Sequence, residues 1–223
     1  MKLAKETVDI LKNVAAINTQ IMVRSGTVLR TISPQKTIMA KAEVADAFPR
    51  DFAIYDLTQF LSALSLFQDP DVDFGEKSLE IIGSNDVRLS YTYASSENVL
   101  AAPSKDIKLP SEDVTARVSK ADLSSVTKAS SVLNLTEVSV VGDGSRVYLV
   151  AGDFKNKSSN TFRLPLDHDK VSTKFSMIFK TENLVKVMPG DYELKISAKG
   201  LSSLKGDVVQ YWIPTETTSK FGE

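Results

Sequence analysis

An amphipathic helix followed by short β-rich runs recurs along this chain, and that repeat is the feature that most limits the folds open to it. The hydrophobic spacing predicts helices over Lys5–Ile17, over residues 56–67, from just after Ser119, and over residues 181–187. Because each helix precedes its own set of strands, the order predicts an α+β chain that uses one helix-plus-strands unit four times.

Alternating hydrophobic residues predict the strands that follow each helix. The expected strands are residues 20–24, 27–32, 71–74, 79–82, 87–93, 138–141, 146–150, 192–198 and 208–214. Asp56 and Ser119 are suited to cap the second and third helices. On the third helix, Leu123, Val126 and Leu133 are expected to share the inward face with Ser130.

The chain is long enough for two domains, since 223 residues exceed the usual size of one. A proline-containing stretch of little periodicity, residues 100–114, is typical of a linker. We therefore expect one domain over residues 1–110, which includes the start of the linker, and a second over residues 111–223.

The overall balance of charge excludes a strongly basic, whole-surface binder of polyanions, because the formal net charge is −1. The sequence contains no cysteine, which suits a reducing cytoplasm and excludes thiolate metal sites. No hydrophobic run approaches the ~20 residues of a membrane span, and the first residues lack the pattern of a signal peptide. Contact with nucleic acid would therefore depend on where individual lysines lie.

Lysines fall on the polar sides of the expected helices, whereas most acids fall in first turns, where the helix dipole favours them. The exposed faces are therefore predicted to be positive or uncharged, as a non-specific DNA surface requires. Exposed lysines are also the ordinary polar face of any helix, so this pattern alone leaves both interpretations open. The candidate DNA-facing residues are Lys5, Lys12, Lys120, Lys128, Lys180 and Lys186.

Three stretches resemble one known family when they are taken together in this order. They are the opening Met-Lys-Leu with Leu-Lys-Asn and Ser-Gly further on (residues 1–26), Ala-Ile-Tyr-Asp-Leu with Phe-Leu and Leu-Ser-Leu (residues 53–66), and Pro-Gly-Asp-Tyr-Glu-Leu with Ala-Lys-Gly (residues 189–200). This set resembles the DNA polymerase sliding clamp of T-even type bacteriophages. Residues 68–120 and 142–175 resemble the family less.

The resemblance implies two similar domains per subunit and a homotrimer closed head to tail, with helices lining the hole and sheets outside. It also implies a non-enzymatic processivity factor in the cytoplasm of an infected bacterium. The implied partners are duplex DNA, the replicative DNA polymerase, a clamp loader and late-transcription factors.

The resemblance further implies an edge-to-edge subunit contact and a hydrophobic pocket near the linker for short C-terminal peptides of partners. The subunit contact would involve Val87, Leu89, Tyr91 and Tyr93 of one subunit and Phe162, Leu164 and Leu166 of the next. The pocket candidates, assigned by position, are Leu109, Pro110, Ile213 and Pro214.

Catalytic and metal-binding patterns are absent or incomplete in the sequence. His168 is the single histidine and is expected in a surface loop, so a nucleophile–histidine relay would depend on it alone. Residues 69–80 approach a calcium loop, but their glycine is displaced by one position. No cofactor or metal is expected. Two alternatives stay open at this point: an α+β adaptor or virion scaffold protein without DNA contact, and a carboxylate-dependent hydrolase.

Overall fold

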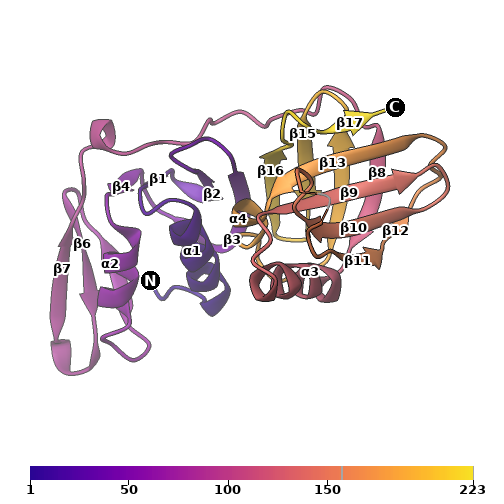
Figure 1. The fold of residues 1–223 in the computed structure, drawn as a ribbon. Helices are drawn as coiled ribbons and strands as arrows, with labels where there is room; N and C mark the ends of the chain where they lie inside the picture. Colours follow the sequence, from indigo (N-terminus) through magenta and orange to yellow (C-terminus); the bar gives the residue numbers. More distant parts are fainter. Residues whose placement is uncertain (157, 223) are drawn as a thin grey trace. The chain divides into compact units, whose positions relative to one another are not determined.

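The computed structural model describes residues 1–156 and 158–222, which form two compact units, Met1–Asp106 and Ile107–Glu223. Each unit combines helices with antiparallel sheets (Figure 1). Within the described residues every helix precedes its own strands, so the α+β class and the repeated order are confirmed. The domain boundary near residue 110 stays a prediction.

The first unit contains two helices that lie side by side and three sets of paired strands. In chain order its elements are α1 (Lys5–Ile17), β1 (Ile21–Val23), β2 (Gly26–Ile32), β3 (Met39–Phe48), β4 (Phe52–Ile54), α2 (Leu57–Leu64), β5 (Asp71–Phe74), β6 (Ser78–Ile82) and β7 (Arg88–Thr92), with 3₁₀ turns at Ser84–Asp86 and Ser96–Asn98. β1 pairs with β4, β2 with β3, and β5, β6 and β7 form one sheet in that order.

The core of the first unit lies between these helices and the sheets. α1 buries Ile10, Leu11 and Val14 on one face, as the helical spacing predicts. An aromatic cluster joins the sheets, because the ring of Phe52 lies 5.8 Å from that of Phe48 and 5.3 Å from that of Phe74.

Within residues 107–156 and 158–222, the second unit contains two antiparallel sheets and the helices between their strands (Figure 1). Its elements are β8 (Val114–Val118), α3 (Lys120–Val132), β9 (Glu137–Asp143), β10 (Val147–Gly152), β11 (Phe162–Pro165), β12 (Asp167–His168), β13 (Lys174–Lys180), α4 (Thr181–Leu184), β14 (Tyr192–Ser197), β15 (Leu201–Lys205), β16 (Val209–Pro214) and β17 (Lys220–Phe221). One sheet has the order β11, β10, β9, β13, β17, and β12, β8, β14, β15 and β16 follow one another in the other.

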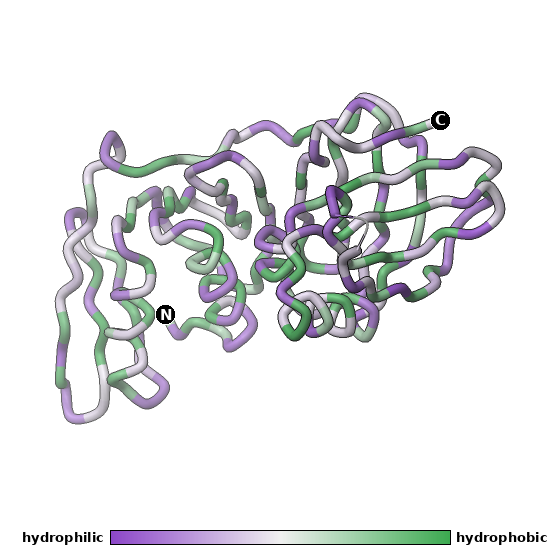
Figure 2. The backbone as a smooth tube through the Cα atoms, viewed as in Figure 1, coloured by the Kyte–Doolittle hydropathy of each residue, from purple (hydrophilic) through white to green (hydrophobic). Residues whose placement is uncertain are grey.

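Hydrophobic and hydrophilic residues alternate along many of these strands, so each sheet turns one face to the core (Figure 2). α3 packs on β9, β10 and β11. The core lies between the two sheets and α3, where Leu123, Leu149 and Leu204 line a common hydrophobic space.

Several details differ from the sequence prediction. α2 ends at Leu64 rather than near residue 67, and α4 is a single turn that ends at Leu184 rather than near residue 187. Leu133, expected on the inward face of the third helix, is the C-cap residue and is 36% exposed, because the helix ends before it. His168 belongs to the short strand β12 rather than to a loop. The sequence pattern did not predict β3, β4, β8, β12, β13, β15 and β17.

Candidate functional site

The exposed face of α1 carries two lysines that share one acid. Lys5 Nζ lies 2.8 Å from Asp9 Oδ2, and Lys12 Nζ lies 3.0 Å from Asp9 Oδ1. Hydrogen bonds from these lysines lower the pKa of Asp9 below its ordinary value. Glu6 is also exposed, so the charges on this face balance. Exposed pairs of this kind contribute only ~0–1 kcal/mol, so a polyanion can compete for the lysines.

The exposed face of α2 carries no charge. Thr58, Gln59, Ser62 and Ser65 are exposed along it. Asp56 caps the helix, because its carboxylate accepts the backbone N–H of Gln59 at 2.9 Å. The predicted uncharged polar face and the predicted N-cap are both confirmed.

The exposed face of α3 is positive. Its first turn is fixed by a capping box, in which Ser119 Oγ accepts the N–H of Asp122 at 3.1 Å and Asp122 Oδ2 accepts the N–H of Ser119 at 2.9 Å. Lys120 and Lys128 are exposed, and neither has an ion-pair partner within residues 1–156 and 158–222. The acid of this helix is held in its cap, so the two lysines dominate the face.

The lysines near α4 lie outside the single helical turn. Lys180 is the N-cap residue, and its Nζ lies 3.9 Å from Glu182 Oε1. Lys186 follows the helix and is half-buried. The role of all six lysines in facing DNA stays a prediction.

Each unit ends a sheet with a short edge strand at the predicted contact positions. β7 is the last strand of its sheet, with Leu89 and Tyr91 half-buried on it. Tyr93 follows β7 and stacks on Phe52 with ring centroids 5.1 Å apart. Val87 precedes β7 and is 57% exposed.

β11 is the edge strand of the second unit. Phe162 and Leu164 are half-buried on it, whereas Leu166 follows the strand and is buried within its own unit. The N–H of Leu166 donates to the carbonyl of Val147 at 2.9 Å, so alternation directs the backbone groups of Arg163 and Pro165 away from β10. Since proline has no N–H, β11 offers the carbonyl of Pro165 as an acceptor only.

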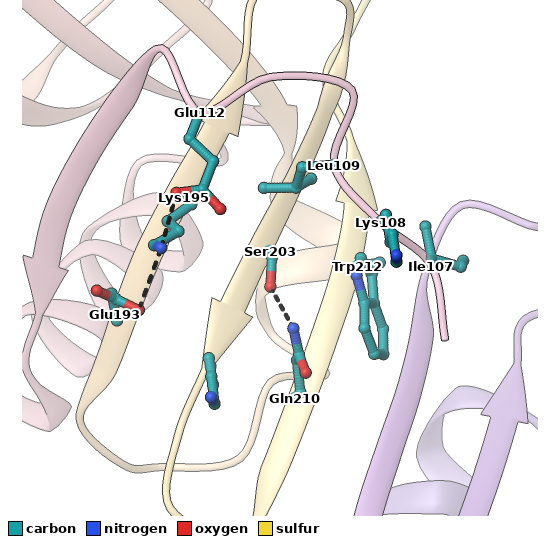
Figure 3. Close-up of a pocket in the computed structure, with 10 residues that line it drawn as sticks. Ile107, Lys108, Leu109, Glu112, Glu193, Lys195, Ser203, Gln210 and Trp212 are labelled. Carbon is teal, nitrogen blue, oxygen red and sulfur yellow. Dashed lines mark hydrogen bonds and ion pairs between the residues drawn. The ribbon is translucent and has the colours of Figure 1, made fainter. Parts of the chain in front are cut away.

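A cavity of about 410 Å³ lies between the linker and the β14–β15–β16 surface of the second unit (Figure 3). Leu109 and Ile107 of the linker line one side, and Trp212 and Gln210 of β16 line the other. Lys195 lies 2.8 Å from Glu112 Oε2 and 3.9 Å from Glu193 Oε2, which leaves Lys108 and Lys205 to give the cavity a positive excess.

The predicted pocket residues divide between this cavity and its surroundings. Leu109 lines it, whereas Pro110 and Pro214 are not among its lining residues. Ile213 is fully buried and points to the opposite face of β16 from Trp212. Sequence reasoning missed Trp212, although the alternation of β16 places it with Gln210 rather than with Ile213. Trp212 is itself 3% exposed and forms the floor.

Catalytic geometry is not apparent around the single histidine. The Nδ1 of His168 lies 2.6 Å from the backbone carbonyl oxygen of Asp169. Among the described residues, no group of three or more histidines and acids is placed to hold a metal ion. In that same part of the chain, no helix combines the length and apolar character that crossing a membrane requires.

Family comparisons cover both units. The model described as DNA polymerase processivity factor matches residues 2–94, and the model described as gp45 sliding clamp, C terminal, matches residues 115–217. The chain is 36% identical over 221 residues to the sliding clamp of Vibrio phage KVP40, covering 97% of this chain and 99% of that relative. It is 30% identical over 227 residues to the sliding clamp of Enterobacteria phage T4, covering 98% of each.

Solved structures share the fold at low sequence identity. The proliferating cellular nuclear antigen of Entamoeba histolytica matches with a TM-score of 0.70 and 14% identity, over 95% of each chain. PCNA of Thermococcus kodakaraensis matches with a TM-score of 0.69 and 15% identity, over 96% of this chain and 99% of that one. The fold is therefore that of DNA clamps, and the matches do not favour an adaptor or scaffold protein.

Proposed function

The chain belongs to the DNA polymerase processivity factors, the family of the sliding clamps of T4-like phages, and we propose that three copies close into a ring around duplex DNA and tether the replicative polymerase. The observation that carries this proposal is the match to sliding clamps along nearly the whole chain. Members of this family are generally non-enzymatic accessory proteins. Retention by enclosure needs no catalytic residue, because the ring topology holds the DNA.

Ring closure is proposed to join β7 of one subunit to β11 of the next. Both strands are short sheet edges with half-buried apolar side chains, and a contact between unlike edges can close head to tail. The N–H of Tyr93 donates to Lys77 at 3.0 Å, so alternation leaves the N–H groups of Arg88, Ser90 and Thr92 directed outward. Pro165 supplies one carbonyl and no donor, so this ladder contains fewer hydrogen bonds than an unbroken edge would make. The ring is therefore expected to open at this contact during loading.

DNA is proposed to pass the exposed faces of α1, α2 and α3. These faces are balanced, uncharged and positive, respectively, so the attraction is weak and independent of sequence. Weak contacts suit a ring that slides, because enclosure rather than affinity prevents loss of the DNA.

The cavity beside the linker is proposed to take C-terminal peptides of the polymerase, and in turn of the clamp loader and of late-transcription factors. Its floor, Trp212, and its wall, Leu109, offer apolar contact. The ammonium groups of Lys108 and Lys205 have no ion-pair partner within residues 1–156 and 158–222, and they suit a peptide that ends in a free carboxylate. The site of action is proposed to be the cytoplasm of an infected bacterium.

Solution mass tests ring formation. Light scattering should give a species near three times the 24.4 kDa chain mass, which dissociates on dilution. Ser90→Pro removes one outward N–H of β7 and should lower trimer stability, whereas Ser90→Ala keeps that N–H and should assemble normally. A monomer at every concentration would remove the enclosure mechanism, and equal assembly of both variants would exclude β7 from the contact.

A further inference from the structure

The strand β2 has an unpaired edge. It is the last strand of its sheet and pairs with β3, whereas the preceding strand β1 pairs with β4. The N–H of Ser33 donates to the carbonyl of Ile38 on the β3 side at 2.9 Å. Because N–H directions alternate along a strand, the backbone groups of Val28 and Arg30 point away from β3. Within the described residues, neither of these two N–H groups has a backbone hydrogen-bond partner.

A cavity of about 390 Å³ lies along this edge, entirely within the first unit. Met22 and Val28 line it from β1 and β2, and Ala101 and Ala102 line it from the start of the linker. β2 carries a register irregularity between Gly26 and Val28, where its pairing with β3 is interrupted. The walls are thus apolar, and unpaired backbone groups lie at one side.

Two arginines supply the charge of this cavity, and no acid lines it. Arg24 Nη1 lies 2.7 Å from Asp51 Oδ2, and Arg30 Nη2 lies 2.5 Å from Asp106 Oδ1. A guanidinium has five N–H donors, so each arginine keeps donors for a second acceptor. The Arg30 side chain is 18% exposed, and its Nη1 is buried without a hydrogen-bond partner among the residues that the structure describes. A buried donor of this kind is unfavourable until an acceptor reaches it.

We propose that this groove, defined by β2, the end of β1 and linker residues 101–104, binds an extended, carboxylate-bearing peptide segment of a partner protein. The peptide backbone would bond the outward groups of Val28 and Arg30, as in strand addition to a sheet edge. A carboxylate would bond the free donors of Arg30 and Arg24, and an apolar neighbour would contact Met22 and Val28. This site is separate from the cavity over Trp212, because the two share no lining residue.

The combination of features selects a peptide over a free anion or nucleic acid. Phosphate would use the arginines but leave the apolar walls and the backbone groups unused. DNA would find only two arginines here, and it would leave the apolar walls and the backbone groups unused. An acidic strand uses the backbone edge, the apolar walls and the arginines together.

The test uses the intact ring and an acetylated octapeptide in which valine and glutamate alternate. Binding is measured by fluorescence anisotropy and by amide chemical-shift changes at Val28 and Arg30. Two probes serve as controls: the same peptide with lysine in place of glutamate, and the same peptide with alternate amides N-methylated. We expect the acidic peptide to bind, with the lysine peptide at least about tenfold weaker, as the loss of ~1.4 kcal/mol gives, and the N-methylated peptide to lose binding.

Variants assign the contact to residues. Arg30→Met and Val28→Pro should each weaken binding of the acidic peptide about tenfold, since each removes one hydrogen-bonding group. Val28→Thr and Lys41→Met should bind like the parent, because the first keeps the N–H and the second changes a neighbour of Asp106 outside the groove. Light scattering confirms that each variant still assembles.

Three results with the peptide would overturn the proposal. These are no binding of the acidic peptide at millimolar concentration, binding that Arg30→Met and Val28→Pro leave unchanged, and shift changes centred on Trp212 instead of β2. Equal shifts at Arg30 with inorganic phosphate alone would reduce the site to an anion contact and would also refute the peptide assignment.

Discussion

The carboxylate of Asp106 fastens the linker to β2 and β3, and removing its charge should loosen the linker. Asp106 Oδ1 lies 2.5 Å from Arg30 Nη2, and Asp106 Oδ2 lies 2.9 Å from Lys41 Nζ. Hydrogen bonds from Lys41 and Arg30 lower the pKa of Asp106 below its usual range, so Asp106 is charged at neutral pH. We call the contacts of Asp106 with Arg30 and Lys41 the Asp106 clasp. Asp106→Asn keeps the size of the side chain and removes the charge from both contacts.

The size of the effect follows from the exposure of the partners. The Asp106 side chain is 54% exposed, so solvent screens each of its two pairs and each contributes little. Loss of both pairs from one carboxylate should change the equilibrium of linker opening by about 2- to 30-fold. Arg30 is largely buried and would lose its charged partner, which favours the upper part of that range.

Hydrogen–deuterium exchange of the linker measures this opening directly. Amides of residues 104–110 should exchange about 3- to 30-fold faster in Asp106→Asn, with the rest of the first unit unchanged. Raising the salt to 1 M should speed exchange in the parent and narrow the difference, because the contacts are exposed. Glu112→Gln is the matched control, since it breaks the pair with Lys195 at the other end of the linker. Exchange within twofold of the parent at low salt would refute the clasp.

Three further predictions concern α3 and the β9–β10 turn. Ser119→Ala should lower the free energy of unfolding by ~1 kcal/mol through loss of the capping box, and urea denaturation measures it; no change would show that the cap is not needed. Backbone N–H groups of Arg146 and Ser145 lower the pKa of Asp143 from 3.8 to about 2, so its stabilisation is present above pH 3.8 and is lost as the pH falls through 2. Turn amides followed by NMR should therefore keep their shifts at pH 4 and change near pH 2, and Asp143→Asn should lack that transition. Replacing both Lys120 and Lys128 by glutamate should slow loading on DNA and leave the trimer intact. The effect should exceed that of the same change at Lys5 and Lys12, because those two lysines already share Asp9. Loss of assembly would contradict the placement of Lys120 and Lys128 in the hole.

The sequence was sufficient where spacing alone decides the structure. The bounds of α1 and the capping residues of α2 and α3 were predicted, because local periodicity and local hydrogen bonds determine them. The contacts of both α1 lysines with Asp9 also follow from i,i+3 and i,i+4 spacing, although they were not predicted from the sequence.

Two of the missed strands, β3 and β15, have compositions that local propensity does not favour. β3 has Ala40 and Ala42 at buried positions and Glu43 at an exposed one, and both residue types are depleted in strands. β15 buries Ser202 and Ser203 as well as Leu204, so the alternation of hydrophobic residues along it is weak. Pairing with neighbouring strands stabilises these segments, and such partners lie far away in the sequence.

The candidate sites also include some positions that the sequence predicted and others that depend on packing in the folded chain. The edge positions of β7 and β11 followed from the family resemblance, and Leu109 was placed beside the cavity by position. Trp212 was missed because the side of β16 that faces the linker depends on packing in the folded unit. The Asp106 clasp joins residues more than sixty positions apart, so no local pattern could reveal it.

Retention on circular DNA tests the central claim most directly. Labelled protein is loaded onto a nicked circular duplex, moved to high salt to remove charge contacts, and followed before and after one restriction cut. The ring account predicts that the protein stays on the circle and leaves within the time of sliding once the DNA is linear. Equal loss from circular and linear DNA at high salt would show that charge rather than enclosure holds the protein, and would contradict the account.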